Sequence, residues 1–321
     1  LSRCRIICSI IPERLTSERT FISLFQGPMA TGSTSRYALT TANILGQSAT
    51  PENVAAIRAE LGLDRPATDR YVEWLRDAVH GDLGKSLANK RPVIDVIGPR
   101  LGNTLFLAIF AAVIAVPLSV MLGILAAIYR GSVFDKLVNI VSLAAISMPE
   151  FFIGYFLILF MSVQLRWFPA IATIKPEQNF FQHLYVTFLP MLTLVLVVVA
   201  HMMRMTRTSV LAVMSSPYVE MAVLKGVPKS RIVVHHALPN ALAPIINVIA
   251  INLAYLIVGV VVVEAVFTFN GLGRLMVDAV AKRDVPVVQA CGLVFAVVFI
   301  SLNLIADVLS ILSNPRLRHP R

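Results

Sequence analysis

The chain has 321 residues, of which 57% are hydrophobic and only 14% are charged, with a formal net charge of +10. Soluble domains are about half apolar and about a quarter charged, so this composition argues against a soluble enzyme or binding domain. The apolar residues gather in runs long enough to cross a bilayer as helices, without the roughly ten-residue alternation of a membrane β-barrel. The positive charge is typical of cytoplasmic loops, and no RNA-binding or zinc-finger pattern accompanies it, so no nucleic-acid partner is expected.

Residues 1–50 differ from the rest of the chain because their apolar stretches are too short to cross a membrane. The stretch at 6–11 is closed by Pro12, the stretch at 21–25 is shorter still, and 27–50 is rich in Gly, Ser, Thr and Ala. We therefore expect neither a membrane span nor a secretory signal peptide in this segment.

Residues 51–100 have a soluble character and are expected to form an extracytoplasmic loop with short helices. A first helix is predicted at 54–61, ended by Gly62. A second, amphipathic helix is predicted from about residue 68 to residue 79. Its apolar side chains, which lie on or near one face, are Tyr71, Trp74, Leu75 and Val79.

Five apolar runs between residues 101 and 313 are predicted to be transmembrane helices. The second run is interrupted by Pro149 and Glu150, and Trp167 and Pro169 follow it in an interfacial pattern. The predicted spans are approximately 103–129, 137–165, 184–203, 242–263 and 287–312.

Basic residues gather in three of the segments that connect or follow these spans. The segments are 130–136, 204–236 and the tail 314–321. Because cytoplasmic loops carry an excess of Lys and Arg, we place this side in the cytoplasm. The segments 51–100, 166–184 and 264–286 then lie outside.

Small residues recur at every fourth position of the first predicted span. Such a series lets a second helix approach closely, either within the subunit or along a transport path. The residues are Ala111, Ala115, Ser119, Gly123 and Ala127.

The segment 218–240 contains two short predicted helices separated by a glycine. Residues 218–225 are helical in character, Gly226 suits a left-handed helix end, and Pro228 suits the start of a second helix. Pro239 then marks the entry to the next span. Such a helix–Gly–helix element suits docking in a groove of another protein, and the alternative is a solvated basic connector.

This segment resembles the "EAA" motif of bacterial ABC importer permeases. The motif begins with Glu-Ala-Ala, and three residues later comes Gly. Nine residues after the Gly comes Ile, then one residue of any kind, and then Leu-Pro. Met221 replaces the first Ala and His236 replaces the Ile. The residues at motif positions, which the resemblance implies form an ATPase-coupling loop within 204–239, are Glu220, Met221, Ala222, Gly226, His236, Leu238 and Pro239.

Further segments of the chain resemble recurrent segments of the dipeptide/oligopeptide (and nickel) branch of these permeases. They occur in the same order and at the same spacing. They lie at 59–66, 81–86, 91–93, 103–104, 264–267, 271–273, 284–286 and 314–316. The resemblance implies an all-α, multi-pass inner membrane protein with the type I ABC importer transmembrane domain. The branch has six spans, so the first is expected to be missing or altered in residues 1–50.

The resemblance also implies the partners of the chain. They are a second permease subunit, two cytoplasmic ABC ATPase subunits, a periplasmic solute-binding protein and membrane lipid. The chain has no P-loop sequence, so a partner is expected to hydrolyse the ATP, and no enzyme activity is expected of the chain itself. Peptides are the expected cargo, with dipeptides, oligopeptides, glutathione-like molecules and nickel all open.

Other residue constellations favour no cofactor and no metal site. The adjacent His235 and His236 point apart on a helix, and Cys4 and Cys8 lack partners for a zinc site. The acids Glu264 and Asp307 lie near predicted span ends and are expected to be interfacial or paired. Two alternative functions stay open: an ion-coupled secondary transporter, and a non-transporting degenerate permease with a damaged N-terminus.

Overall fold

The computed structural model describes residues 65–174, 177–228, 231–232 and 237–313, and its regular elements there are all helices. The chain divides into two compact units, residues 1–76 and 77–321. The predicted all-α fold is therefore confirmed for the described residues. The predictions for residues 1–50, the helix at 54–61 and the tail 314–321 lie outside them.

The amphipathic helix predicted near residue 68 is present as α4, Ala67–Val79. An ion pair joins Arg65 Nη1 to Glu73 Oε2 at 2.6 Å, and both side chains are more than half exposed. An exposed pair of this kind adds little stability.

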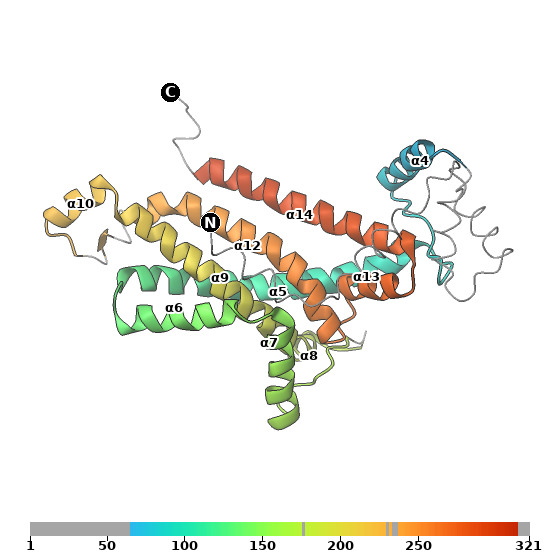
Figure 1. Ribbon diagram of the computed structural model, residues 1–321, viewed down its shortest axis with the longest axis horizontal. Helices are drawn as coiled ribbons and strands as arrows, with labels where there is room; N and C mark the ends of the chain where they lie inside the picture. Colours follow the sequence, from blue (N-terminus) through green and yellow to red (C-terminus); the bar gives the residue numbers. More distant parts are fainter. Residues whose placement is uncertain (1–64, 175–176, 229–230, 233–236, 314–321) are drawn as a thin grey trace, which may run out of the picture. The chain divides into compact units, whose positions relative to one another are not determined.

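The second unit is built from long helices connected by short ones (Figure 1). The helices that follow α4 in chain order are α5 Val93–Ile128, α6 Val133–Ile146, α7 Glu150–Leu157 with the π-helical η3 Ile158–Gln164, α8 Phe180–Val186, α9 Phe188–Met214, α10 Pro217–Leu224, α12 Leu238–Val266, α13 Leu272–Ala281 and α14 Val285–Ser313.

Four described helices, α5, α9, α12 and α14, are long and apolar enough to cross a membrane. A fifth span results if α6 and the α7–η3 helix count as one, which agrees with the five predicted spans. The interruption predicted at Pro149 and Glu150 within the second span, 137–165, is present, and the two helices on either side of it meet at an angle of 101°. Pro149 causes the break: its backbone is extended, with ψ of 144°, and it has no N–H to continue a helix.

The four long helices are longer than the apolar runs that predicted them, and α5 and α9 extend furthest beyond one end of their runs. Helix α5 begins at Val93 rather than near residue 103, because Val93 and Ile97 are buried against α13 and α14. Helix α9 continues to Met214, so the segment 204–214 is helical and not part of a loop. Hydropathy falls at Arg204 and Arg207, but an arginine does not interrupt backbone hydrogen bonding.

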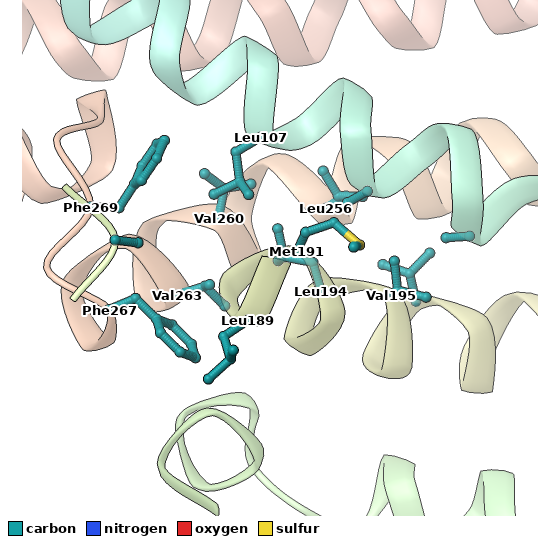
Figure 2. Close-up of a cluster of buried hydrophobic side chains, with 14 of the residues drawn as sticks. Leu107, Leu189, Met191, Leu194, Val195, Leu256, Val260, Val263, Phe267 and Phe269 are labelled. Atoms are coloured by element: carbon teal, nitrogen blue, oxygen red, sulfur yellow. The ribbon is translucent and has the colours of Figure 1, made fainter. Parts of the chain in front are cut away.

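The central core lies where α5, α9 and α12 pack together (Figure 2). Figure 2 shows the side chains of Leu107 of α5, Val260 of α12 and Met191 of α9 gathered where the three helices meet. Phe267 and Phe269, which follow α12, close one end of this core and are fully buried. Three helices distant in sequence are thereby joined by close packing of apolar side chains.

The small residues of α5 form its contact with α9. The five residues of the series are all buried: Ala111, Ala115, Ser119, Gly123 and Ala127. Ser119 Oγ lies 2.8 Å from Met202 Sδ of α9. A Cβ atom added at Gly123 would lie 2.8 Å from both the Met203 carbonyl oxygen and Thr206 Cβ. The series therefore lets two helices pack closely within the subunit, as such residues do in membrane proteins.

We expect Gly123→Ala to lower the melting temperature of the purified protein, because the new methyl group must displace α9 backbone. Overpacking of this kind costs about 1–3 kcal/mol. The matched control is Gly102→Ala on the same helix, where an added Cβ would meet nothing within 4 Å. Thermal denaturation in detergent should show a loss for the first variant and no loss for the second, and equal melting temperatures would contradict the close contact.

Candidate functional site

The segment α10–Gly226 has the helix–Gly form that the sequence predicts. Pro217 occupies the first turn of α10, and the chain turns after Lys225 at Gly226, whose φ is +75°. Gly226 N–H donates to Val223 O at 2.9 Å and Val227 N–H to Ala222 O at 3.2 Å. This pair of bonds is the Schellman motif, in which glycine favours the left-handed position.

Only part of the second predicted helix is described. Ile232 N–H donates to Pro228 O at 3.0 Å, which is a helical hydrogen bond, and the Ile232 side chain is buried. Residues 229–230 and 233–236, and with them His236, lie outside the described residues. Leu238 and Pro239 form the first turn of α12, as the sequence predicts for Pro239.

Helix α10 presents apolar side chains to its surroundings. Val219 is buried and attaches the helix to the rest of the chain, while Met221 is 55% and Leu224 80% exposed. Glu220 is also exposed and Ala222 is half-buried. Met221, which stands where the motif has alanine, is thus largely exposed in the part of the chain that the structure describes.

A cavity of about 640 Å³ opens along the α10-proximal half of α9. Polar side chains on its wall recur at helical spacing at His201, Arg204 and Thr208, so they share one face of α9. These side chains lie beyond or at the end of the span predicted from the sequence, which ends at residue 203, so this site was not among the predicted ones. The remaining lining residues are Ile146, Met205, Ser209, Ala212, Val213, Pro244 and Val248.

A buried ion pair attaches α9 to α6 near this cavity. Arg207 Nε and Nη2 each lie 2.8 Å from one carboxylate oxygen of Asp135. Gly131 N–H and Asn139 Nδ2 also donate to that carboxylate, at 3.0 and 2.8 Å. Because the Asp135 side chain is only 6% exposed, these donors replace its water.

A second buried carboxylate, Glu264, joins three segments at the opposite end of the helices. Thr104 Oγ1 donates to Glu264 Oε1 at 2.6 Å, and Gly273 and Arg274 N–H donate to Oε2 at 2.8 and 3.1 Å. Leu272 N–H donates to Thr104 Oγ1 at 2.7 Å. The first three N–H groups of α13, which lack partners within the helix, are therefore all satisfied. The expectation that Glu264 is paired is confirmed.

A third network joins the loop before α5 to the turn before α14. The carboxylate of buried Asp284 accepts hydrogen bonds from Ser86 Oγ at 2.5 Å, Leu87 N–H at 3.1 Å and Ala88 N–H at 3.3 Å. Five of the short segments singled out in the sequence, at 81–86, 103–104, 264–267, 271–273 and 284–286, thus contribute to two buried polar networks.

The described residues contain no group of three or more His, Cys, Asp or Glu side chains that could hold a metal ion. Cys291 is buried among apolar neighbours, whereas Cys4, Cys8, His235 and His236 lie outside this part of the chain. Asp307 is exposed on α14.

Two family models match the chain. The one described as "Binding-protein-dependent transport system inner membrane component" matches residues 119–319, and "Binding-prot-dependent transport system membrane comp, N-term" matches residues 37–108. The chain belongs to this family. It is accordingly a multi-pass inner membrane protein and a permease subunit of an ABC importer.

Curated relatives place the chain within the peptide branch of these permeases. It is 40% identical to the "Glutathione transport system permease protein GsiC" of Shigella flexneri serotype 5b (strain 8401), over 86% of this chain and 88% of the relative. The GsiC protein of Escherichia coli (strain K12) is 39% identical over the same shares. The "Probable peptide ABC transporter permease protein y4tP" of Sinorhizobium fredii is 38% identical, again over 86% and 88%. The resemblance to the dipeptide/oligopeptide branch is thus confirmed.

The fold is that of a type I importer permease. A chain of the inward-facing MetNI methionine ABC transporter superposes with a TM-score of 0.51 at 18% identity, and the match covers 69% of this chain and 96% of that one. The predicted fold class is confirmed by this match and by the helix count.

Proposed function

We propose that this permease imports short peptides across the inner membrane, using ATP that two partner ATPase subunits hydrolyse. The support for peptides is the identity of about two residues in five with permeases named for glutathione and peptide transport. The other proposed partners are a second permease, which completes the path through the membrane, and a periplasmic solute-binding protein, which delivers the cargo.

The observation that carries the coupling to ATP hydrolysis is the exposed apolar surface of α10. Side chains such as Met221 and Leu224 extend from a helix that directly follows the long α9. A short helix that exposes apolar side chains is suited to binding a groove in a partner protein. In our proposal the ATPase provides that groove, and its movement on ATP binding reaches the spans through α9.

The proposed arrangement in the membrane follows the distribution of basic residues. The α10 segment and the tail 314–321 lie in the cytoplasm, and residues 51–100 lie in the periplasm as a loop with short helices. Residues 101–313 form the transmembrane domain, and the coupling loop, predicted at 204–239, begins only after α9 ends at Met214. Cysteine-accessibility labelling of whole cells at Tyr218 and Lys85 tests this arrangement, because only the second position should react with an impermeant reagent.

We expect Gly226→Ala to reduce recovery of the co-expressed ATPase by about tenfold. The substitution strains a residue with φ of +75° by about 1–2 kcal/mol and loosens the turn that holds α10. The matched control is Gly131→Ala, because Gly131 also has positive φ, +83°, and an added Cβ there likewise meets nothing within 4 Å. Affinity purification of the permease followed by quantification of the ATPase gives the measurement.

Recovery of the ATPase should fall in the Gly226 variant and stay at the wild-type level in the Gly131 variant. If both variants recover the ATPase equally well, α10 is not the docking element. Leu224→Asp adds a charge to the proposed contact surface without altering the turn, and it should reduce recovery at least as much.

A further inference from the structure

Helix α9 has a polar face inside a segment long and apolar enough to cross the membrane. His201, Arg204 and Thr208 are all exposed on this face, while the opposite side of α9 is buried against α5. A charged side chain within a span costs about 2.5–3.5 kcal/mol when it faces lipid, so such residues line protein interiors or aqueous cavities. The cavity of about 640 Å³ along α9 is the space that these side chains line.

The charge of Arg204 is not neutralised by the described part of the chain. No acidic side chain lines the cavity, and Arg204 makes no ion pair there among the described residues. Arg207, three residues further along the same helix, instead donates from Nε and Nη2 to the two carboxylate oxygens of Asp135. The cavity therefore has a net positive charge, and the Arg204 guanidinium lies in it without an acidic partner among the described residues. Such a guanidinium is suited to binding a carboxylate.

The hydroxyl groups of the cavity complement this charge. Thr208 Oγ1 donates to Arg204 O and Ser209 Oγ donates to Met205 O, each at 2.9 Å. Because each proton is already committed to the backbone, the oxygen atoms remain as acceptors. The cavity therefore offers donors for a carboxylate, acceptors for N–H groups and an apolar wall from Pro244 and Val248.

We propose that the α9 cavity is a cargo-binding site on the transport path, in which Arg204 binds the carboxylate of a short peptide. The oxygens of Thr208 and Ser209 accept hydrogen bonds from peptide N–H groups. The volume lies within the range of about 300–1,000 Å³ that small-molecule sites have. The inference rests on the proposed peptide function and adds the chemical group that the permease itself recognises.

The test uses the complete transporter in proteoliposomes, with the second permease, both ATPases and saturating solute-binding protein. Import of trialanine and of its C-terminal amide is measured for the wild type, Arg204→Gln and Arg204→Lys. Because the binding protein itself can discriminate between the peptides, each variant is compared with the wild type for one peptide at a time. Lys136→Gln, which removes an exposed positive charge outside the cavity, is the matched control.

We expect Arg204→Gln to slow trialanine import by about tenfold or more, the value of one charge-assisted hydrogen bond. Import of the amide should change less than twofold, Arg204→Lys should retain most of the trialanine rate, and Lys136→Gln should behave as the wild type. An equal loss for both peptides, or loss of the second permease from the complex, would overturn the site and assign Arg204 to structure or subunit contact. A wild type that imports neither peptide would overturn the peptide function and the site with it.

A second measurement does not depend on turnover. In a background with the three native cysteines replaced by serine, Thr208→Cys is labelled with a sulfonate-bearing and a trimethylammonium-bearing thiosulfonate. We expect the anionic reagent to react about tenfold faster than the cationic one, with trialanine slowing it, because Arg204 attracts anions. Adding Arg204→Gln should make the two rates equal, and equal rates in its absence would overturn the proposal.

Discussion

Replacing Glu264 by alanine is expected to lower the free energy of unfolding by about 3–5 kcal/mol, because the buried donors around it lose their acceptor. Glu264 is fully buried and accepts from Thr104 Oγ1 and from the N–H groups of Gly273 and Arg274. These two N–H groups belong to the first turn of α13, which has no other acceptor for them within the helix. Denaturant titration in detergent, followed by tryptophan fluorescence, gives the measurement.

Two further variants distinguish the effect of losing these hydrogen bonds from the effect of simply losing side-chain volume. Thr104→Val keeps the size of the side chain and removes one donor, so its cost should be smaller, about 1–2 kcal/mol. Gly271→Ala should be as severe as the Glu264 variant, because a Cβ at Gly271 would overlap the Glu264 carboxylate. Stability of Glu264→Ala within 1 kcal/mol of the wild type would show that water satisfies the donors and that the network is dispensable.

Breaking the ion pair between α6 and α9 is the second change that we expect to lower the free energy of unfolding by a large amount. Arg207→Met leaves the Asp135 carboxylate buried without its main partner, which costs about 3–5 kcal/mol in proteins. The double variant with Asp135→Leu should recover much of this loss, because two apolar side chains replace two charges. The free energies of unfolding of both single variants and the double variant form a cycle that measures the coupling.

The control for the ion pair is an exposed pair in the same chain. Arg274 Nε lies 3.8 Å from Asp278 Oδ2 on α13, and both side chains are more than a quarter exposed. Asp278→Asn should change stability by less than about 1 kcal/mol, as exposed pairs do. If Arg207→Met costs no more than this control, the pair is solvated and does not hold α6 against α9.

Much of the architecture could be predicted because membrane helices obey a simple rule. Hydrocarbon offers no partner to backbone groups, so long apolar runs must be helices, and the five runs appear as four long helices and a bent pair. Local backbone chemistry was equally predictable at Pro149, which ends a helix, and at Gly226, which adopts the left-handed conformation. The helix ends were not predictable from hydropathy, because Val93 and Met214 extend α5 and α9 beyond their apolar runs.

Part of the candidate site could likewise be predicted from the sequence, and part of it could not. The resemblance to the "EAA" motif identified the residues from Glu220 to Pro239, and their role in docking stays a prediction. The polar face of α9 was visible in principle, since His201, Arg204 and Thr208 recur at helical spacing within and just after an apolar run. It does not stand out in the sequence, because charged residues mark the end of a predicted span.

The sequence by itself determined that this protein is a helical membrane permease, because composition, apolar runs and ordered motifs are properties of the linear chain. Only the tertiary structure decided which polar residues act together. Glu264 meets Thr104 across 160 positions, Asp284 meets Ser86 across 198, and Arg207 meets Asp135 across 72. Such pairings depend on how the helices pack, and packing follows from side-chain shape and burial over the whole domain, which no local pattern contains.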